Sequence, residues 1–368
     1  MWIHEDKNWP NFTWDKAALA FKLADIRYRQ GRLLGRMEQL GFELKRESSL
    51  NILTNDVVKT SAIEGENLDP LEVRSSIARR LGINIAGLIP ASRNVEGIVE
   101  ILLDATQNFH KPLSKTRLFS WHSALFPTGY SGMHPITIGN WRTEASGPMQ
   151  VISGPLGRQK IHFEAPNAAL LENEIQSFLK WFSKKHEIDT VIKAGIAHLW
   201  FITIHPFEDG NGRIARAIGD MALALSDGTQ NRFYSLSSQI EAERKNYYKQ
   251  LEMQQRGTPN ITRWLSWFLD CLGRAIDNAE ITLSNVLYKA KLLDFVNLKP
   301  VNKRQLLIIN RMLENDFIGY MNTSKYAKLA KCSNDTALRD IQELKAREIF
   351  IQNPSGGRST SYRLKDNI

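Results

Sequence analysis

The sequence predicts a mainly α-helical protein with one β-hairpin in its middle and a winged helix-turn-helix at its C-terminal end. Apolar residues recur every three or four positions over most of the chain, as helices with one buried face require. A stretch rich in Gly, Pro and Ser at 129–167 contains short alternating runs, which is typical of a hairpin. Beyond residue 300 the pattern is three helices and then two short strands, the order of a winged helix-turn-helix.

The composition is that of a folded globular chain with an excess of positive charge. Of its 368 residues, 42% are apolar and 24% charged, and the net charge of +9 permits an anionic partner. The longest nearly uncharged apolar stretch, near Ala194–Ile204, is too short to span a bilayer, and the acidic first residues do not resemble a signal peptide. Cys271 and Cys332 lie far apart, so neither a disulfide framework nor a cysteine-based metal site is expected. We therefore expect a cytoplasmic protein with no membrane partner.

Residues 1–90 are predicted to form an N-terminal helical domain without strands. After an aromatic opening, leucine and isoleucine recur at spacings of four and three, which predicts a first helix. A second helix is predicted over about 48–64, and a loop around Asp69-Pro70 separates it from a third helix at 95–105. The third helix belongs to the central domain that we expect at 91–296.

The central domain is predicted as helices around the hairpin. The runs MQVISG and QKIHF flank a turn at 154–157 and predict the two strands. From Ala168 to about Phe295 the helical period continues, with one predicted break at Pro206–Gly212. A linker at 297–302 then leads to the C-terminal domain.

Residues 301–368 are predicted as the winged helix-turn-helix, and they hold 12 Lys or Arg against 7 Asp or Glu. In such a domain 333–347 would be the recognition helix, with Arg339 and Lys345 toward DNA and Arg358 in the wing toward phosphate. Four acidic residues dilute this basic face: Asp335, Asp340, Glu343 and Glu348. Binding of DNA and binding of a protein therefore both remain open for this domain. The helices before the recognition helix are expected at 304–313 and 323–330, and the strands in FIQNPSGG and RSTSYRL.

The segment HPFEDGNGRIAR, 205–216, carries the most informative chemistry. Pro206 should end the apolar helix before it, and two glycines then make a tight loop that leads into a new helix. The free backbone N–H groups at a helix N-terminus bind phosphate, and glycines let an anion approach closely. Arg213 and Arg216 lie three residues apart, near enough on one helix to grip a polyphosphate together.

Two further residues of this segment are suited to catalysis. Asp209 offers a hard oxygen ligand for Mg²⁺, which usually binds one or two carboxylates plus substrate phosphates. His205, at the edge of the loop, accepts a proton near neutral pH. Each residue alone is more simply explained by a turn, a cap or a solvated face. The whole set in this order predicts a phosphoryl- or nucleotidyl-transfer site.

The segment resembles the Fic motif, HxFx(D/E)GN(G/K)RxxR. It matches at every fixed position: His205, Phe207, Asp209, Gly210, Asn211, Gly212, Arg213 and Arg216. Most Fic enzymes transfer AMP from ATP to a hydroxyl group of a target protein, so the resemblance implies ATP as co-substrate and Mg²⁺ as cofactor. The motif has Gly212 where the Doc-like kinase branch carries lysine, which favours AMP transfer over phosphate transfer.

The resemblance also implies a role for each motif residue. His205 would deprotonate a Ser, Thr or Tyr hydroxyl, and Asp209 would hold Mg²⁺ against the α- and β-phosphates. The remaining roles are a phosphate cradle for Gly210, Asn211 and Gly212, contacts with the outer phosphates for Arg213 and Arg216, and an anchor in the core for Phe207.

The residues before the predicted hairpin, GNWRTEASGPMQVISG at 139–154, resemble the stretch that leads into the Fic flap. The flap aligns the target protein by main-chain pairing, so the implied partner is a target that docks on the hairpin at 150–163. Val151, Ile152 and Ser153 would then lie nearest the nucleotide. An ordinary surface hairpin is the alternative.

The segment ERKNYYKQLE, 243–252, resembles the part of Fic proteins whose tyrosine pair lines the adenine side of the nucleotide. Tyr247 and Tyr248 are the candidates here, and two half-buried core tyrosines are the alternative. The opening MWIHEDKNWPNFTWD resembles a small domain of unknown function that precedes the Fic core in many bacterial proteins. Self-modification and a homodimer both remain open.

The segment TSAIEG, from Thr60 to Gly65, fits the inhibitory motif (S/T)xxxE(G/N) of autoinhibited Fic proteins. Gly65 is a good helix stop, which would leave Glu64 in a last turn whose dipole disfavours an anion. The resemblance implies that Glu64 pairs with Arg216 and keeps it from the γ-phosphate, while Thr60 helps to fix an inhibitory helix at about 48–65. This is the second of three inhibition classes, in which the inhibitory motif lies N-terminal to the catalytic loop.

Three functions follow from these patterns. The first is a protein adenylyltransferase that Glu64 restrains. Because the same glutamate supports AMP removal in some relatives, a de-AMPylating or bifunctional Fic enzyme is the second. The third, from another class, is a DNA-binding transcriptional regulator whose Fic core senses nucleotide.

Overall fold

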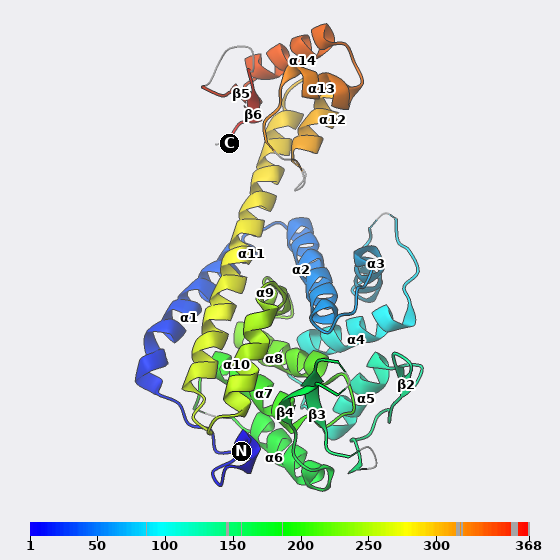
Figure 1. Ribbon diagram of the computed structural model, residues 1–368. Helices are drawn as coiled ribbons and strands as arrows, with labels where there is room; N and C mark the ends of the chain where they lie inside the picture. Colours follow the sequence, from blue (N-terminus) through cyan, green and yellow to red (C-terminus); the bar gives the residue numbers. More distant parts are fainter. Residues whose placement is uncertain are drawn as a thin grey trace. The chain divides into compact units, whose positions relative to one another are not determined.

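The computed structural model describes residues 1–85, 87–144, 147–155, 157–185, 187–313, 317, 319–354 and 360–366. The chain divides into two compact units, Met1–Ala279 and Glu280–Ile368, and both are mainly helical, as predicted (Figure 1). A finer division of the first unit at residue 90 stays a prediction. No helix of the described part combines the length and the apolar character that a membrane crossing requires.

The N-terminal region contains three helices where the sequence indicated two. Helix α1 (Lys16–Glu38) is capped by Asp15, and α2 (Phe42–Ile63) begins six residues before the predicted start. The loop predicted after α2 is wrong, because α3 (Pro70–Arg80) occupies it. The Asp69 carboxylate accepts a hydrogen bond from Leu71 N at 2.8 Å, and proline at the first helical position is already set for a helix.

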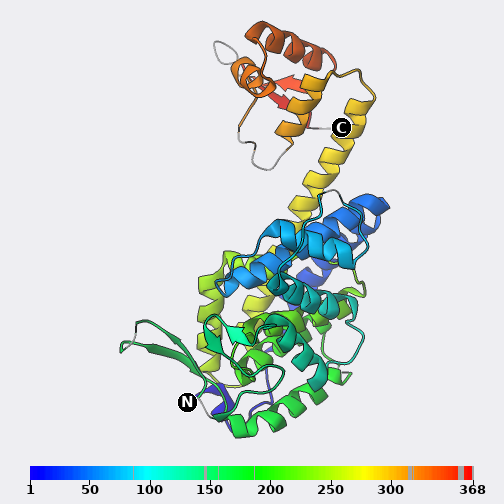
Figure 2. The same ribbon diagram turned by 90° about the vertical axis from the view of Figure 1, so that its right-hand side faces the viewer.

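The rest of the first unit is built around the buried α7, which packs along α8 and against α6, while α4 and α5 pack on α8 (Figure 1). The hairpin β3–β4 is antiparallel and extends from this helical body (Figure 2). The elements are α4 (Arg93–Gln107), α5 (Lys115–Leu125), β1 (Tyr130–Ser131), β2 (His134–Pro135), β3 (Gln150–Ser153), β4 (Lys160–Glu164), α6 (Leu171–Ser183), α7 (Thr190–Ile204), α8 (Asn211–Asp227), α9 (Leu236–Ala242), α10 (Arg244–Gln255) and α11 (Thr262–Asn297), whose residues from Glu280 on belong to the second unit.

The predicted break at Pro206–Gly212 is confirmed, but the single-break prediction is wrong. The helical region is also interrupted before α7, after α8 and after α10. Asp189 starts α7 by accepting a bond from Val191 N, and Gly228 ends α8 with a left-handed φ of 66°. These local signals outweigh a hydrophobic period that continues across them.

The second unit contains the predicted order of elements. After the end of α11 come α12 (Lys303–Met312), α13 (Thr323–Ala330) and α14 (Asn334–Ala346), and then the antiparallel pair β5 (Phe350–Gln352) and β6 (Tyr362–Leu364). Its core includes Ile308, Tyr326 and Ile341, all fully buried. Arg358 lies outside the described residues.

Candidate active site

A cavity of about 680 Å³ lies in the first unit between the hairpin, α10 and the N-terminal end of α8. Its size is within the range of sites for small molecules. Ten residues singled out from the sequence line it: Glu64, Val151, Ile152, Ser153, His205, Asp209, Asn211, Gly212, Tyr247 and Tyr248. Thr60, Gly210, Arg213 and Arg216 are not lining residues but lie next to some of them in the chain or in space.

The loop after α7 is held in shape by contacts with its backbone. His205 adopts a left-handed conformation with a φ of 51°, which ends α7. Arg142 Nε donates to His205 O at 2.8 Å, and Arg142 N donates to Pro206 O at 2.9 Å. Arg142 was not singled out from the sequence, where its neighbours Trp141 and Thr143 give no signal for this buried contact.

The histidine has the tautomer that a proton acceptor needs. His205 Nδ1 lies 3.1 Å from the Ile202 carbonyl oxygen. Because a carbonyl only accepts, Nδ1 carries the proton and Nε2 keeps its lone pair. Burial lowers the pKa of His205 to about 4, although the Ile202 carbonyl acts in the opposite direction. The ring is therefore neutral at pH 7.

Asn211 and Phe207 fix the loop from inside. The Asn211 side chain donates to Phe207 O at 2.8 Å and accepts from Phe207 N at 3.0 Å. The fully buried Phe207 ring stacks on His122 with a centroid distance of 4.1 Å. The anchor role of Phe207 fits this packing. Because the side-chain amide of Asn211 is hydrogen-bonded within the loop, the backbone N–H of Asn211 is the group that remains for binding an anion.

The N-terminal end of α8 provides the predicted anion-binding groups. Gly210 caps the helix with a φ of 80°, and the first intrahelical bond runs from Ile214 N to Gly210 O at 3.1 Å. The N–H groups of Asn211, Gly212 and Arg213 precede that bond, so they are the unpaired donors of the helix start. Such donors, together with the helix dipole, favour a phosphate or a carboxylate.

The Glu64 carboxylate lies at this helix start. Glu64 follows the last residue of α2, and Gly65, with a φ of 88°, ends the helix through bonds from Gly65 N to Ala62 O and from Glu66 N to Ser61 O. A Cβ atom on Gly212 would lie 2.2 Å from Glu64 Oε1. A glycine at 212 thus leaves the space that the carboxylate uses.

Arg216 holds the same carboxylate from the other side. Its Nη2 donates to Glu64 Oε1 at 2.7 Å, and its Nε donates to Thr60 Oγ1 at 2.7 Å. The Arg216 side chain is 2% exposed, and Tyr248 OH lies 3.4 Å from Glu64 Oε2. The residues that the inhibitory motif pairs are therefore in direct contact.

A second glutamate was missed from the sequence. Arg213 Nη1 donates to Glu66 Oε2 at 2.6 Å, and the Arg213 side chain is 8% exposed against 42% for Glu66. Glu66 lies outside the inhibitory motif, and the one available signal was a second carboxylate two residues after Glu64. Both arginines predicted to bind phosphate are thus paired with carboxylates that follow α2.

The carboxylate predicted to hold a metal ion, Asp209, lines the cavity, as do Glu64 and Glu252. Asp209 accepts hydrogen bonds from the Ser131 hydroxyl and from Gly210 N. Among the described residues there is no cluster of three or more His, Cys, Asp or Glu that could hold a metal by itself. One carboxylate beside an anion site fits Mg²⁺, which completes its shell with substrate phosphates and water.

The tyrosines differ in position. Tyr247 is buried, and its hydroxyl lies 2.9 Å from His198 Nε2, whereas Tyr248 is 39% exposed. Burial raises the pKa of Tyr248, so its hydroxyl stays protonated at neutral pH. Both line the cavity, and their place on the adenine side of a nucleotide stays a prediction.

The hairpin covers one side of the cavity. Val151 pairs with Phe163 and Ser153 with Lys160, with an irregularity between Val151 and Ile152. Within the described part, β3 and β4 form a two-stranded sheet, so each strand has an edge available for main-chain pairing.

Two family models match the chain. The model of the Fic/DOC family matches residues 112–223, and a domain of unknown function, DUF4172, matches residues 2–83. The second match agrees with the resemblance seen at the N-terminus.

Curated relatives are named as protein adenylyltransferases. A "Probable protein adenylyltransferase" of Aquifex aeolicus is 31% identical over 120 residues, which are 33% of this chain and 33% of the relative. A protein adenylyltransferase of Caenorhabditis elegans is 25% identical over 173 residues, 46% of this chain and 31% of the relative. The matches thus span about a third of the length of these relatives.

Solved structures share the fold. A Fic family protein from Desulfovibrio desulfuricans G20 has a TM-score of 0.52 and 20% identity, over 94% of this chain and 95% of that one. A Fic domain containing signaling protein from Bacteroides thetaiotaomicron has a TM-score of 0.50 and 18% identity, over 69% and 96%. At these identities the likeness is one of fold.

Proposed function

This chain contains a Fic/DOC domain, and we propose on that basis that the protein is an adenylyltransferase, which transfers AMP from ATP to a hydroxyl group of a target protein. The single observation that carries the proposal is the cavity in which a neutral imidazole adjoins a helix start suited to anions. His205 supplies the base, and α8 supplies the N–H groups. Most of the residues implied by the motif meet there.

The reaction follows from the positions of these groups. The N–H groups of α8 and the two arginines would bind the phosphates, and Asp209 would hold Mg²⁺, which neutralises phosphate charge when bound. His205 Nε2 takes the proton of the target hydroxyl. The hydroxyl oxygen then bonds to the α-phosphorus, the bond from that phosphorus to the bridging oxygen breaks, and pyrophosphate leaves.

The proposal includes restraint by Glu64. Its carboxylate occupies the anion-binding start of α8 and pairs with Arg216 at 2.7 Å. A triphosphate that needs these groups must compete with it. Nucleotide can then bind in the cavity, but the outer phosphate lacks Arg216, and transfer stays slow.

The target is proposed to dock on the hairpin. Val151 and Ile152 are 36% and 46% exposed, and the strand has an edge available for pairing. An extended segment that adds a strand there would bring its hydroxyl to the cavity wall.

The experiment is label transfer by the Glu64→Gly chain with Mg²⁺ and ATP labelled at either the α- or the γ-phosphate. AMP transfer predicts protein label from α-labelled ATP and none from γ-labelled ATP. Label from the γ-position alone would identify phosphate transfer and overturn the proposal.

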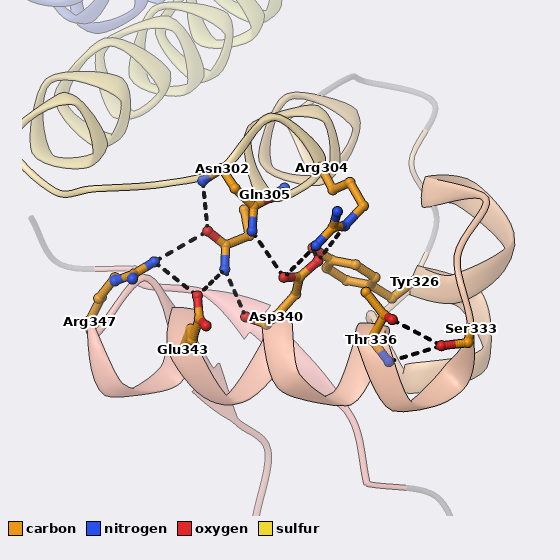
Figure 3. A network of polar contacts seen from close by, with 9 residues as sticks. All are labelled: Asn302, Arg304, Gln305, Tyr326, Ser333, Thr336, Asp340, Glu343 and Arg347. Atoms are coloured by element: carbon orange, nitrogen blue, oxygen red, sulfur yellow. Dashed lines mark hydrogen bonds and ion pairs between the residues drawn. The ribbon is translucent and has the colours of Figure 1, made fainter.

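A second candidate function, DNA binding by the second unit, is favoured by how its charges are arranged. Asp340 of α14 is 4% exposed and faces α12, where Arg304 Nε donates to it at 2.9 Å and Asn302 Nδ2 at 3.0 Å (Figure 3). Glu343 accepts from Gln305 Nε2 at 2.9 Å and lies 3.4 Å from Arg347 Nη1.

Most of the acidic residues on the predicted basic face are therefore paired with polar or basic side chains of the second unit. Glu348 pairs with Lys365 at 2.9 Å. Among the described residues of α13, α14 and the turn between them, four cations are exposed without an ion pair: Lys328, Lys331, Arg339 and Lys345, the last donating to Gln352 Oε1 at 2.7 Å. We further propose that this surface binds the phosphates of duplex DNA.

We expect duplex DNA to bind the full chain in a salt-sensitive manner, and Lys328→Ala plus Arg339→Ala to lower the slope of log affinity against log salt by about 1 for each residue. Fluorescence anisotropy with a labelled duplex measures this. Lys184→Ala plus Lys185→Ala, which removes two exposed positive charges from the first unit, serves as control. Equal slopes for all variants, or no binding at low salt, would refute DNA binding.

A further inference from the structure

A chain of hydrogen bonds joins the hairpin to α10 at the wall of the cavity. Ser153 Oγ lies 2.6 Å from His162 Nε2, and His162 Nδ1 lies 2.8 Å from Glu252 Oε2. Ser153 is on β3, His162 on β4 and Glu252 on α10, and all three line the cavity that also contains His205. Lys160 Nζ lies 2.9 Å from Glu252 Oε1 and fixes the carboxylate.

The directions of these bonds follow from what each group can donate. The ionised carboxylate of Glu252 only accepts, so His162 Nδ1 carries the proton, and Nε2 has the lone pair. The hydroxyl of Ser153 is then the donor to Nε2. A hydroxyl bonded to an imidazole that a carboxylate orients is the arrangement that makes serine a nucleophile.

The contacts within the hairpin do not require this arrangement. Arg256 Nη2 already ties β4 to α10 through the Ile161 carbonyl at 2.6 Å, and the ladder pairs Ser153 with Lys160. The hydroxyl, its base and the orienting carboxylate nevertheless converge on the one cavity that the proposed nucleotide would occupy.

We propose that Ser153 is an acceptor of AMP within the same chain, with His162 as its base; this rests on the proposed function. Ser153 Oγ bonds to the α-phosphorus of ATP, the bond from that phosphorus to the bridging oxygen breaks, and pyrophosphate leaves. The hydroxyl proton passes to His162 Nε2 and then to water. The product is an acid-stable phosphodiester on β3, on the strand where the target is proposed to pair.

The test uses the full chain with Glu64→Gly, Mg²⁺ and α-labelled ATP at a saturating concentration for each variant. Ser153→Ala should lower self-labelling at least tenfold, and Ser153→Thr should restore part of it because it keeps a hydroxyl. Ser183→Ala, on an exposed serine at the end of α6 that does not line the cavity, is the matched control and should label fully. Mass spectrometry should find AMP on the peptide that contains Ser153.

His162→Gln tests the base: it keeps the Ser153 hydroxyl but should slow self-labelling at least tenfold. The Ser153→Thr chain, which keeps both a hydroxyl and His162, should still label itself. Full labelling of Ser153→Ala would overturn the inference and leave the proposed function intact. Label that acid removes would lie on nitrogen, place AMP on His162 and also overturn it. A Glu64→Gly chain that binds ATP but does not label itself contradicts the inference, and one that binds no ATP contradicts the proposed function.

Discussion

Replacing Glu64 by glycine is expected to raise the rate of AMP transfer about 10- to 150-fold. This factor corresponds to about 1.5–3 kcal/mol, the free energy of the charge-assisted hydrogen bond to Arg216 with which ATP no longer competes. The substitution removes the carboxylate from Arg216 Nη2, which still donates to Thr60 O, and empties the space beside Gly212 where the carboxylate now lies. The backbone tolerates glycine there, because residue 64 has ordinary angles of −88° and 2°. Initial rates of protein labelling from α-labelled ATP measure the effect.

Two variants show which part of the contact matters. Glu64→Gln keeps the length and an oxygen that accepts from Arg216 but removes the charge, so its rate should lie between those of the wild type and the glycine variant. Glu66→Gly should have a smaller effect, because the Glu66 side chain is 42% exposed and its ion pair with Arg213 is screened by water.

The same substitution should change how ATP stabilises the protein. Without Glu64, Arg216 is a buried cation that keeps Thr60 but lacks a counter-charge. Bound triphosphate would supply that charge, so ATP should raise the melting temperature more for the variant than for the wild type. Equal labelling rates and equal shifts by ATP would contradict a restraining role of Glu64.

The parts of the fold that the sequence predicts well depend on near neighbours in the chain. Pro206 and the two glycines after it define the end of α7 and the start of α8, and Gly65 defines the end of α2. In the second unit, Ser333, the first residue of the predicted recognition helix, caps α14. Helix α3 also has such a signal in Asp69-Pro70, but this pair is equally typical of a loop, and a loop is what the sequence predicts there.

The contacts that the sequence did not indicate join residues far apart in the chain. Arg142 reaches the His205 carbonyl across 63 positions, Glu66 reaches Arg213 across 147, and His162 reaches Glu252 across 90. No spacing or period encodes such pairs, because they depend on how helices pack. Glu64 and Arg216 are also far apart in the chain. Their pairing was nevertheless predicted, because each of them lies in a segment that resembles a motif of the Fic family.

Substitution of His205 is expected to lower transfer about 10²- to 10⁴-fold, the usual contribution of a positioned base. Its Nε2 is the acceptor in the tautomer that the Ile202 carbonyl imposes. In His205→Asn the base is lost but the backbone is kept, because asparagine tolerates the left-handed conformation of this residue better than alanine. The measurement is transfer by the Glu64→Gly chain with and without this substitution, with ATP affinity determined by calorimetry.

The pH dependence of the rate tests whether the base is a histidine whose pKa is lowered by burial. Since burial lowers the pKa of His205 to about 4, the ring stays unprotonated through pH 5.5, and kcat/KM should change little between pH 8 and pH 5.5 on its account. The pKa in the folded state lies below the usual 6.5, so the unfolded chain binds the proton more readily, and stability declines as pH falls from about 6.5 toward 4. Rates must therefore be compared above pH 5, where the protein keeps most of its stability. A fall of kcat/KM with decreasing pH and a midpoint near pH 6.5 would exclude His205 with a lowered pKa as the base.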